Sequence, residues 1–384
     1  MLIKKKEGLS ITKNPTIEFS VIFGKLKLKS PYLWCKGKVS KPLVSKMGIT
    51  HQGRTETVER ALVDFGSEEA FIPASKRFRE HYKYDIGSSA VSRVTKQTAQ
   101  EAMKYVEDKL SEAGKNYSDV EKEESVETVK EMLVELDGCE IRTAELSIKE
   151  DSIETTPVYN NPKKEKIIKW RDVRIGSARP LETASKIYVG KMASYPEVVR
   201  QLFNASILNG MSPKTKVIGV ADGGIGLYEE LKNQFTNMQF ILDKPHLKDH
   251  LYDTAEELGI AKNERAAWVK PRLKAISNGD VGRIWKELKD KYACCPNKRL
   301  KRLIGYINRF FDALNYKDFK EKGYPIGSGE VESAHKYVPQ KRMKLPGACW
   351  HPDTINPMLA LRILRANAWW GDFWNERTRD KIAA

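Results

Sequence analysis

Three short, largely apolar segments, each running directly into an aspartate, place the strongest constraint on the fold of this chain. These pairs of segment and acid are residues 133–136 with Asp137, residues 217–221 with Asp222, and residues 238–242 with Asp243. Short apolar runs bounded by turn residues are typical of buried strands. A helical pattern, LYEELKNQF, separates the second segment from the third. Strands that alternate with helices predict an α/β core.

The rest of this half of the chain extends the same pattern. Further strands are predicted at residues 170–178 and 185–193, and a helix begins near Pro196. From His246 to about residue 319 the periodicity is helical only. We therefore expect residues 131–384 to form an α/β domain with a mixed sheet and an all-helical insertion at about 247–320.

The first part of the chain has a different character. Residues 1–50 contain the alternating run KLKLK and predict a small β-containing region. Residues 51–130 predict three short helices followed by a charged helical connector. The third helix begins near Ser88 and carries Arg93 and Lys96 on its outer side. This pattern fits a helix-turn-helix that reads a DNA groove, with those two side chains as DNA contacts; a three-helix packing module without a DNA role is the alternative.

The charge of the chain favours a polyanionic partner. The 67 Lys and Arg residues outnumber the 51 Asp and Glu residues, so the formal net charge is +16. The five cysteines form no C-x-x-C pair, which indicates neither a disulfide framework nor a thiolate zinc site. No secretory signal or membrane-spanning segment is predicted, so we expect a cytoplasmic protein with access to the chromosome.

Three carboxylates are the candidate catalytic groups. Asp137 and Asp222 are expected to end apolar strands, and Glu332 begins a helix after the glycine turn GSG. Carboxylates gathered at the edge of a sheet repel one another unless cations neutralise them, and oxygen ligands suit Mg²⁺ or Mn²⁺. Two such ions can act on a phosphodiester. The alternative for each Asp-Gly pair is an ordinary turn.

Other polar residues near these acids are candidates for phosphate contacts. His246 follows the third apolar segment, and we leave open whether it contacts a phosphate, supports the site or is structural. The region 297–345 has 12 Lys and Arg residues against 5 Asp and Glu residues. Next to a metal site, phosphate contacts explain this excess better than a solvated face does. The predicted contacts are Lys336, Lys341, Arg342 and Lys344.

Several motifs resemble a known family. VELDGCEIRT, VADGG, ILDKPHLKDHL, PIGSGEVESAHKYVPQKRMK and LALRILRANAWWGDFW occur in an order similar to bacterial insertion-sequence transposases of the ISKra type, related to the Mutator-like DDE group. The resemblance covers roughly residues 51–374. It implies an RNase H-like core in which Asp137, Asp222 and Glu332 form a DDE triad that binds two Mg²⁺ or Mn²⁺ ions. The chain departs from the family at DGGIGL, where Gly226 replaces a tryptophan.

The resemblance also implies a function. A transposase of this type binds the double-stranded ends of a mobile element, cleaves phosphodiesters and joins the freed 3′-hydroxyl ends to target DNA. Because two ends must be held together, we expect a homo-oligomer on DNA. Two alternatives remain open, a nuclease of the same fold that does not transfer strands and a domesticated DNA-binding protein with an inert core.

Overall fold

The computed structural model describes residues 10–35, 38–50, 52–115, 117, 129–148 and 164–383. The chain divides into two compact units. The first unit contains residues 1–106, 341–346 and 353–384, and the second contains residues 107–340 and 347–352. Part of the charged connector expected before residue 131 lies outside the described residues.

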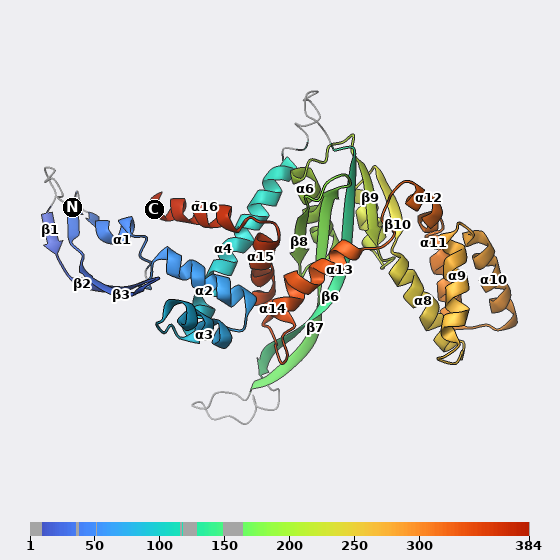
Figure 1. The fold of residues 1–384 in the computed structure, drawn as a ribbon, viewed down its shortest axis with the longest axis horizontal. Helices are drawn as coiled ribbons and strands as arrows, with labels where there is room; N and C mark the ends of the chain where they lie inside the picture. Colours follow the sequence, from blue (N-terminus) through green and yellow to red (C-terminus); the bar gives the residue numbers. More distant parts are fainter. Residues whose placement is uncertain are drawn as a thin grey trace. The chain divides into compact units, whose positions relative to one another are not determined.

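A five-stranded mixed sheet forms the centre of the second unit, with strand order β10-β9-β6-β7-β8 (Figure 1). Its strands are β6 (Glu131–Ile148), β7 (Lys164–Pro180), β8 (Ile187–Lys191), β9 (Lys216–Ala221) and β10 (Met238–Leu242). β6, β9 and β10 run parallel to one another, while β7 is antiparallel to both β6 and β8. The predicted α/β class and mixed sheet are confirmed.

Helices pack on both faces of this sheet. Since successive side chains of β6 point to opposite faces, neighbouring residues contact different helices. On one face, Leu136 packs near Gly176 and Leu202, and Leu202 belongs to helix α6 (Tyr195–Leu208). On the other face, Glu135 accepts a hydrogen bond from the start of helix α13 (Gly329–His335). Since Asp137 is two residues from Glu135, it points to the α13 side.

The strandless stretch predicted after His246 is confirmed. It folds into helices α8 (Lys244–Glu257), α9 (Arg265–Ser277), α10 (Val281–Cys294), α11 (Lys298–Arg309) and α12 (Tyr316–Glu321). The helix α7 (Leu227–Gln234) joins β9 to β10. Among the described residues, no helix is both long and apolar enough to cross a membrane.

The first unit contains the β-containing N-terminal region and the predicted helices. Its elements are β1 (Ser10–Lys13), β2 (Thr16–Val21), β3 (Gly24–Lys29), β4 (Tyr32–Cys35), β5 (Lys38–Ser40), α1 (Pro42–Lys46), α2 (Glu56–Glu68), α3 (Phe71–Tyr82) and the part of α4 (Ser88–Lys115) up to residue 106. α4 is a single long helix that includes the third predicted helix and the beginning of the expected connector. Val91, Val94 and Thr98 are buried along it, whereas Arg93 and Lys96 are exposed, as the periodicity predicts.

The C-terminal helices belong to this first unit rather than to the sheet domain that the sequence assigned them to. They are α14 (Lys341–Met343), α15 (Ile355–Ala366) and α16 (Trp370–Ala383). The buried guanidinium of Arg377 pairs with Glu59 and Glu101, and that of Arg362 pairs with Glu68. These buried ion pairs connect residues that are about 300 positions apart in the sequence. Four aromatic residues near the end of the chain are buried in this unit: Trp369, Trp370, Phe373 and Trp374.

Candidate active site

Three aspartates follow the last paired residues of the three parallel strands. Leu136 pairs with Ala221, and Ala221 pairs with Leu242. The next residue in each strand is therefore an acid, which puts Asp137, Asp222 and Asp243 at the same carboxyl edge of the sheet. This is the edge where α/β sheets collect functional groups. Asp243 is a site residue that sequence reasoning missed, although it ends an apolar run just as Asp222 does.

The position of Asp137 corrects one prediction. Asp137 neither ends a strand nor starts a turn, because β6 continues through it to Ile148. The continuation pairs antiparallel with β7, where Asp137 lies opposite Ile175. What ends before Asp137 is only the pairing with β9. Asp222, by contrast, does follow the end of its strand, and its Oδ1 accepts a hydrogen bond from the Gly224 amide at 3.1 Å.

Asp243 is fully buried and holds two parts of the site. Its Oδ1 accepts a hydrogen bond from the Ser328 amide at 3.0 Å, in the glycine turn before α13. Its Oδ2 makes a short hydrogen bond with Nδ1 of His246. This bond raises the pKa of His246 to about 9 against the effect of burial, with help from the charges of Asp243, Asp137 and Asp222. His246 is therefore a cation at neutral pH, fixed in orientation beside the acids.

A second histidine faces Asp137. Nε2 of His335 lies 3.4 Å from Oδ2 of Asp137, and the His335 side chain is buried. Burial lowers the pKa of His335, but its interactions with Asp137 and Cys139 outweigh this and raise the pKa to about 9. Burial likewise opposes ionisation of Asp137, yet His335 and the Gly138 amide bring its pKa below the usual value. At neutral pH this contact is an ion pair, and Asp137 is a carboxylate.

Helix α13 is fixed over this edge by two further carboxyl groups. Oε2 of Glu135, which is 1% exposed, accepts a hydrogen bond from the Val331 amide at 2.8 Å. Glu330 pairs with Arg179 at 2.8 Å and with Lys186 at 3.5 Å. Glu330 therefore links the start of α13 to Arg179 on β7. Glu135 was missed, although a glutamate inside an otherwise apolar strand is the signal that could have revealed it.

Glu332 lies on α13, three residues before the histidine that contacts Asp137. It follows the glycine turn on α13, as predicted, and its side chain is exposed. Across the parts of the chain that the structure describes, no group of three His, Cys, Asp or Glu residues is placed to hold a metal ion. Strand pairing puts Asp137, Asp222 and Asp243 at one edge of the sheet, and Asp243 holds His246. The role of Glu332 as third ligand stays a prediction.

The four predicted phosphate contacts differ in exposure and in the unit to which they belong. Lys336 is exposed and directly follows α13, in the short π-helix Lys336–Gln340. Lys341 and Lys344 are exposed but belong to the first unit, where Lys341 pairs with Glu68. The prediction for Arg342 is wrong. Its side chain is buried, and its Nε donates to the carbonyl of Gly66 at 3.0 Å, so the guanidinium supports the packing of α14 on α2.

The raised pKa of Glu135 predicts a pH-dependent stability. Burial raises the pKa of this carboxyl from 4.5 to about 8, aided by the charges of Glu330 and Asp243. Because the folded state binds the proton more tightly than the unfolded state, stability falls as pH rises from about 5 to about 8. Glu135→Gln, which keeps an acceptor for Val331, is expected to raise the free energy of unfolding at pH 8 by roughly 3 kcal/mol.

Urea denaturation of both proteins at pH 5 and pH 8 measures this effect. The advantage of Glu135→Gln should shrink to about 1 kcal/mol or less at pH 5, where the folded-state carboxyl is protonated and the pH is close to the ordinary pKa of the unfolded state. Glu140→Gln, an exposed position on the same strand, is the control and should show no such dependence. An equal advantage at both pH values would contradict the assignment.

Comparisons with known proteins give only a distant structural likeness. No protein-family model and no curated protein sequence matches the chain. Among solved structures, one similar chain is from the Drosophila P element transposase strand transfer complex. It has 10% sequence identity and a TM-score of 0.38, and the match covers 85% of this chain and 96% of that chain. So distant a likeness carries no argument about function.

Proposed function

We propose that the second unit is an RNase H-like catalytic core and that the protein is a DNA transposase of the insertion-sequence type. The observation that carries this proposal is the shared edge of Asp137 and Asp222. Strand pairing puts these acids on neighbouring strands, and the charges of both help to raise the pKa of His246, which Asp243 holds. The motif resemblance assigns the same two acids to a DDE triad.

The donor chemistry of this edge fits Mg²⁺ or Mn²⁺. Asp137 is ionised and half-buried, and Asp222 is half-buried, so both offer hard oxygen ligands on a rigid sheet. Asp137 and Asp222 would hold the ions, with Glu332 as the proposed third carboxylate. When bound, such ions activate a water or a 3′-hydroxyl and stabilise the leaving oxygen.

The remaining residues of the site would act on the DNA backbone. His246 is positively charged at neutral pH and is proposed to face the scissile phosphate, where it offsets the charge of the acids. Asp243 positions His246 without touching the substrate. We propose three phosphate contacts to the DNA of the element ends. They are Lys336, which follows α13, and Arg93 and Lys96 on α4. Transposition needs two ends, so we also propose a homo-oligomer on DNA.

The test of this proposal is a joining assay with the DNA that flanks the gene, in which a transposase predicts terminal inverted repeats. The purified protein is incubated with labelled DNA carrying one such end, a target plasmid and Mg²⁺. A transposase yields labelled plasmid in which the 3′ end is covalently joined. Cleaved ends without joined plasmid would support a nuclease instead, and binding without cleavage would support an inert DNA-binding protein.

A further inference from the structure

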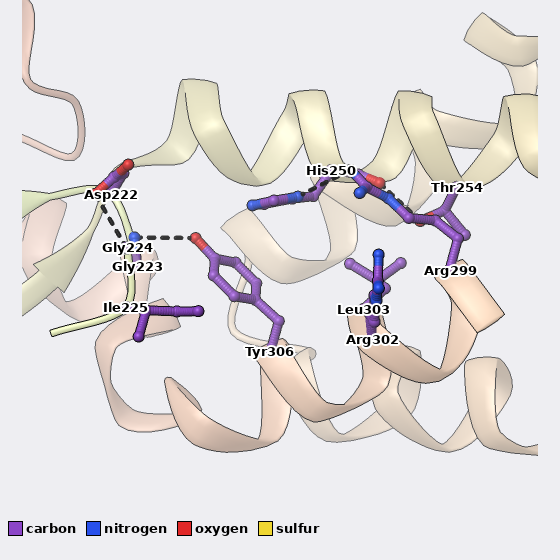
Figure 2. Close-up of a pocket in the computed structure, with 10 residues that line it drawn as sticks. All are labelled: Asp222, Gly223, Gly224, Ile225, His250, Thr254, Arg299, Arg302, Leu303 and Tyr306. Carbon is purple, nitrogen blue, oxygen red and sulfur yellow. Dashed lines mark hydrogen bonds between the residues drawn. The ribbon is translucent and has the colours of Figure 1, made fainter. Parts of the chain in front are cut away.

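A cavity of about 390 Å³ opens beside Asp222, and the proposed cleavage chemistry does not use it. It lies between the loop after β9 and helices α8 and α11 (Figure 2). Its volume is in the range of sites that hold small organic ligands. Asp222 is at one end of the lining, and Arg299 and Arg302 are at the other, with Tyr306 between them.

The aromatic wall of this cavity is fixed in place. The Gly223 amide donates a hydrogen bond to Oη of Tyr306 at 3.3 Å, and the His250 ring centroid lies 4.5 Å from that of Tyr306. A Cβ at Gly223 would come within 2.4 Å of the Tyr306 ring, so glycine permits this close approach. Leu303 and Ile225 add apolar surface to the lining. The two rings are tilted by 58° to each other, so the Tyr306 ring, held against Gly223, is the surface on which a planar, uncharged group could pack.

The opposite end of the cavity is cationic. Arg299 is held in place by Asp253, and its Nη2 lies 3.4 Å from Nδ1 of His250. Arg302 is exposed and lies one helical turn before Tyr306 on α11. A ligand matched to this lining therefore has a planar part for Tyr306 and an anionic part for the arginines. It must also tolerate Asp222 at the other end.

We propose that this cavity binds one unstacked nucleotide of a DNA strand, next to the phosphate on which the acids act. The base packs on Tyr306, and the adjoining phosphate pairs with Arg299 and Arg302. Aromatic and arginine side chains bind single-stranded nucleic acid in this way. A lone phosphate would leave the aromatic wall unused. This inference rests on the proposed function, because it assumes that DNA is the substrate.

Fluorescence anisotropy of a labelled single-stranded 12-mer of thymidine, measured in EDTA to prevent cleavage, tests the proposal. Tyr306→Leu removes the aromatic face but keeps an apolar side chain, and it should weaken binding about five-fold or more. An otherwise identical abasic strand should bind wild type and Tyr306→Leu equally. Arg302→Ala should lower the slope of log affinity against log salt by about one.

Lys301→Ala is the matched control, since Lys301 is exposed on the same helix and does not line the cavity. It should leave both affinity and salt slope unchanged. Arg302→Ala keeps the proposal falsifiable if Tyr306→Leu unfolds, because Arg302 is exposed. Thymidine monophosphate should compete only weakly; competition as strong as that of the strand would assign the cavity to a free nucleotide and overturn the proposal.

Two failures are distinguishable. In the first, wild type binds the strand, and both Tyr306→Leu and Arg302→Ala bind it equally well, with Tyr306→Leu as thermally stable as wild type. The cavity is then not a nucleotide site, and the transposase proposal is unaffected. If wild type binds neither this strand nor double-stranded element ends, the proposed function itself fails, and the inference fails with it.

Discussion

Asp222→Asn is expected to reduce Mg²⁺-dependent DNA cleavage by at least about a thousand-fold, since an amide cannot replace a carboxylate that holds the ions. The fold should tolerate the change. Asp222 is half-buried in the loop after β9, and its Oδ1 accepts only the Gly224 amide among the hydrogen bonds of the described residues. An asparagine oxygen can accept that bond equally well. Single-turnover cleavage and thermal unfolding of the same preparation measure the two effects.

Asp172→Asn provides the matched control for this loss. Asp172 is an exposed aspartate of the same sheet, on β7, and its partner is Arg174 at 3.4 Å. A surface pair of this kind contributes little to stability. The control should cleave at the wild-type rate, so a comparable loss in both variants would point to a general charge effect. Wild-type cleavage by Asp222→Asn would remove this acid from the proposed active site.

Asp243→Ala is expected to damage both stability and activity. The substitution leaves the buried Ser328 amide without its acceptor and His246 without its anionic partner. Removing one member of such a buried charged pair costs about 3–5 kcal/mol. Because the Ser328 turn leads into α13 and His246 faces the acids, the cleavage rate of the folded fraction should fall as well. Urea denaturation and single-turnover cleavage separate the two losses.

A milder variant tests the positioning role of Asp243. Asp243→Asn keeps an acceptor for Ser328 but lowers the pKa of His246 toward its ordinary value, because the anion that raises it is gone. Its cleavage rate should therefore fall as pH rises from about 6 to about 8, a range over which wild-type His246 stays largely protonated. Asp249→Ala, an exposed acid on α8, is the control. A pH profile identical to wild type would contradict the role given to Asp243.

The sequence predicted the parts of this fold that local patterns determine. Apolar runs marked β9 and β10, and helical periodicity marked the strandless stretch after His246. The length of β6 escaped prediction because Asp137-Gly138 is a turn signal in isolation. Only the antiparallel partner β7, paired with it over 17 residues of each strand, keeps that dipeptide extended.

The errors at the site come from contacts between distant residues. Arg342 sits in a basic run that reads as a phosphate-binding surface, yet its guanidinium bonds a carbonyl 276 residues earlier in the chain. Asp243 carries the same signal as Asp222, an acid after an apolar run, but its burial depends on the turn at Ser328. No local pattern distinguishes an acid that supports a site from one that faces the substrate.

The joining assay tests the central claim most directly when wild type and Asp137→Asn are compared on the same labelled element end. Asp137 is the acid that both strand pairing and the motif resemblance place at the proposed active site. We predict that wild type forms joined plasmid with Mg²⁺ and none with EDTA. Asp137→Asn should bind the end with unchanged affinity and form no joined plasmid. Joining by Asp137→Asn at the wild-type rate, or Mg²⁺-independent joining by wild type, would contradict the account.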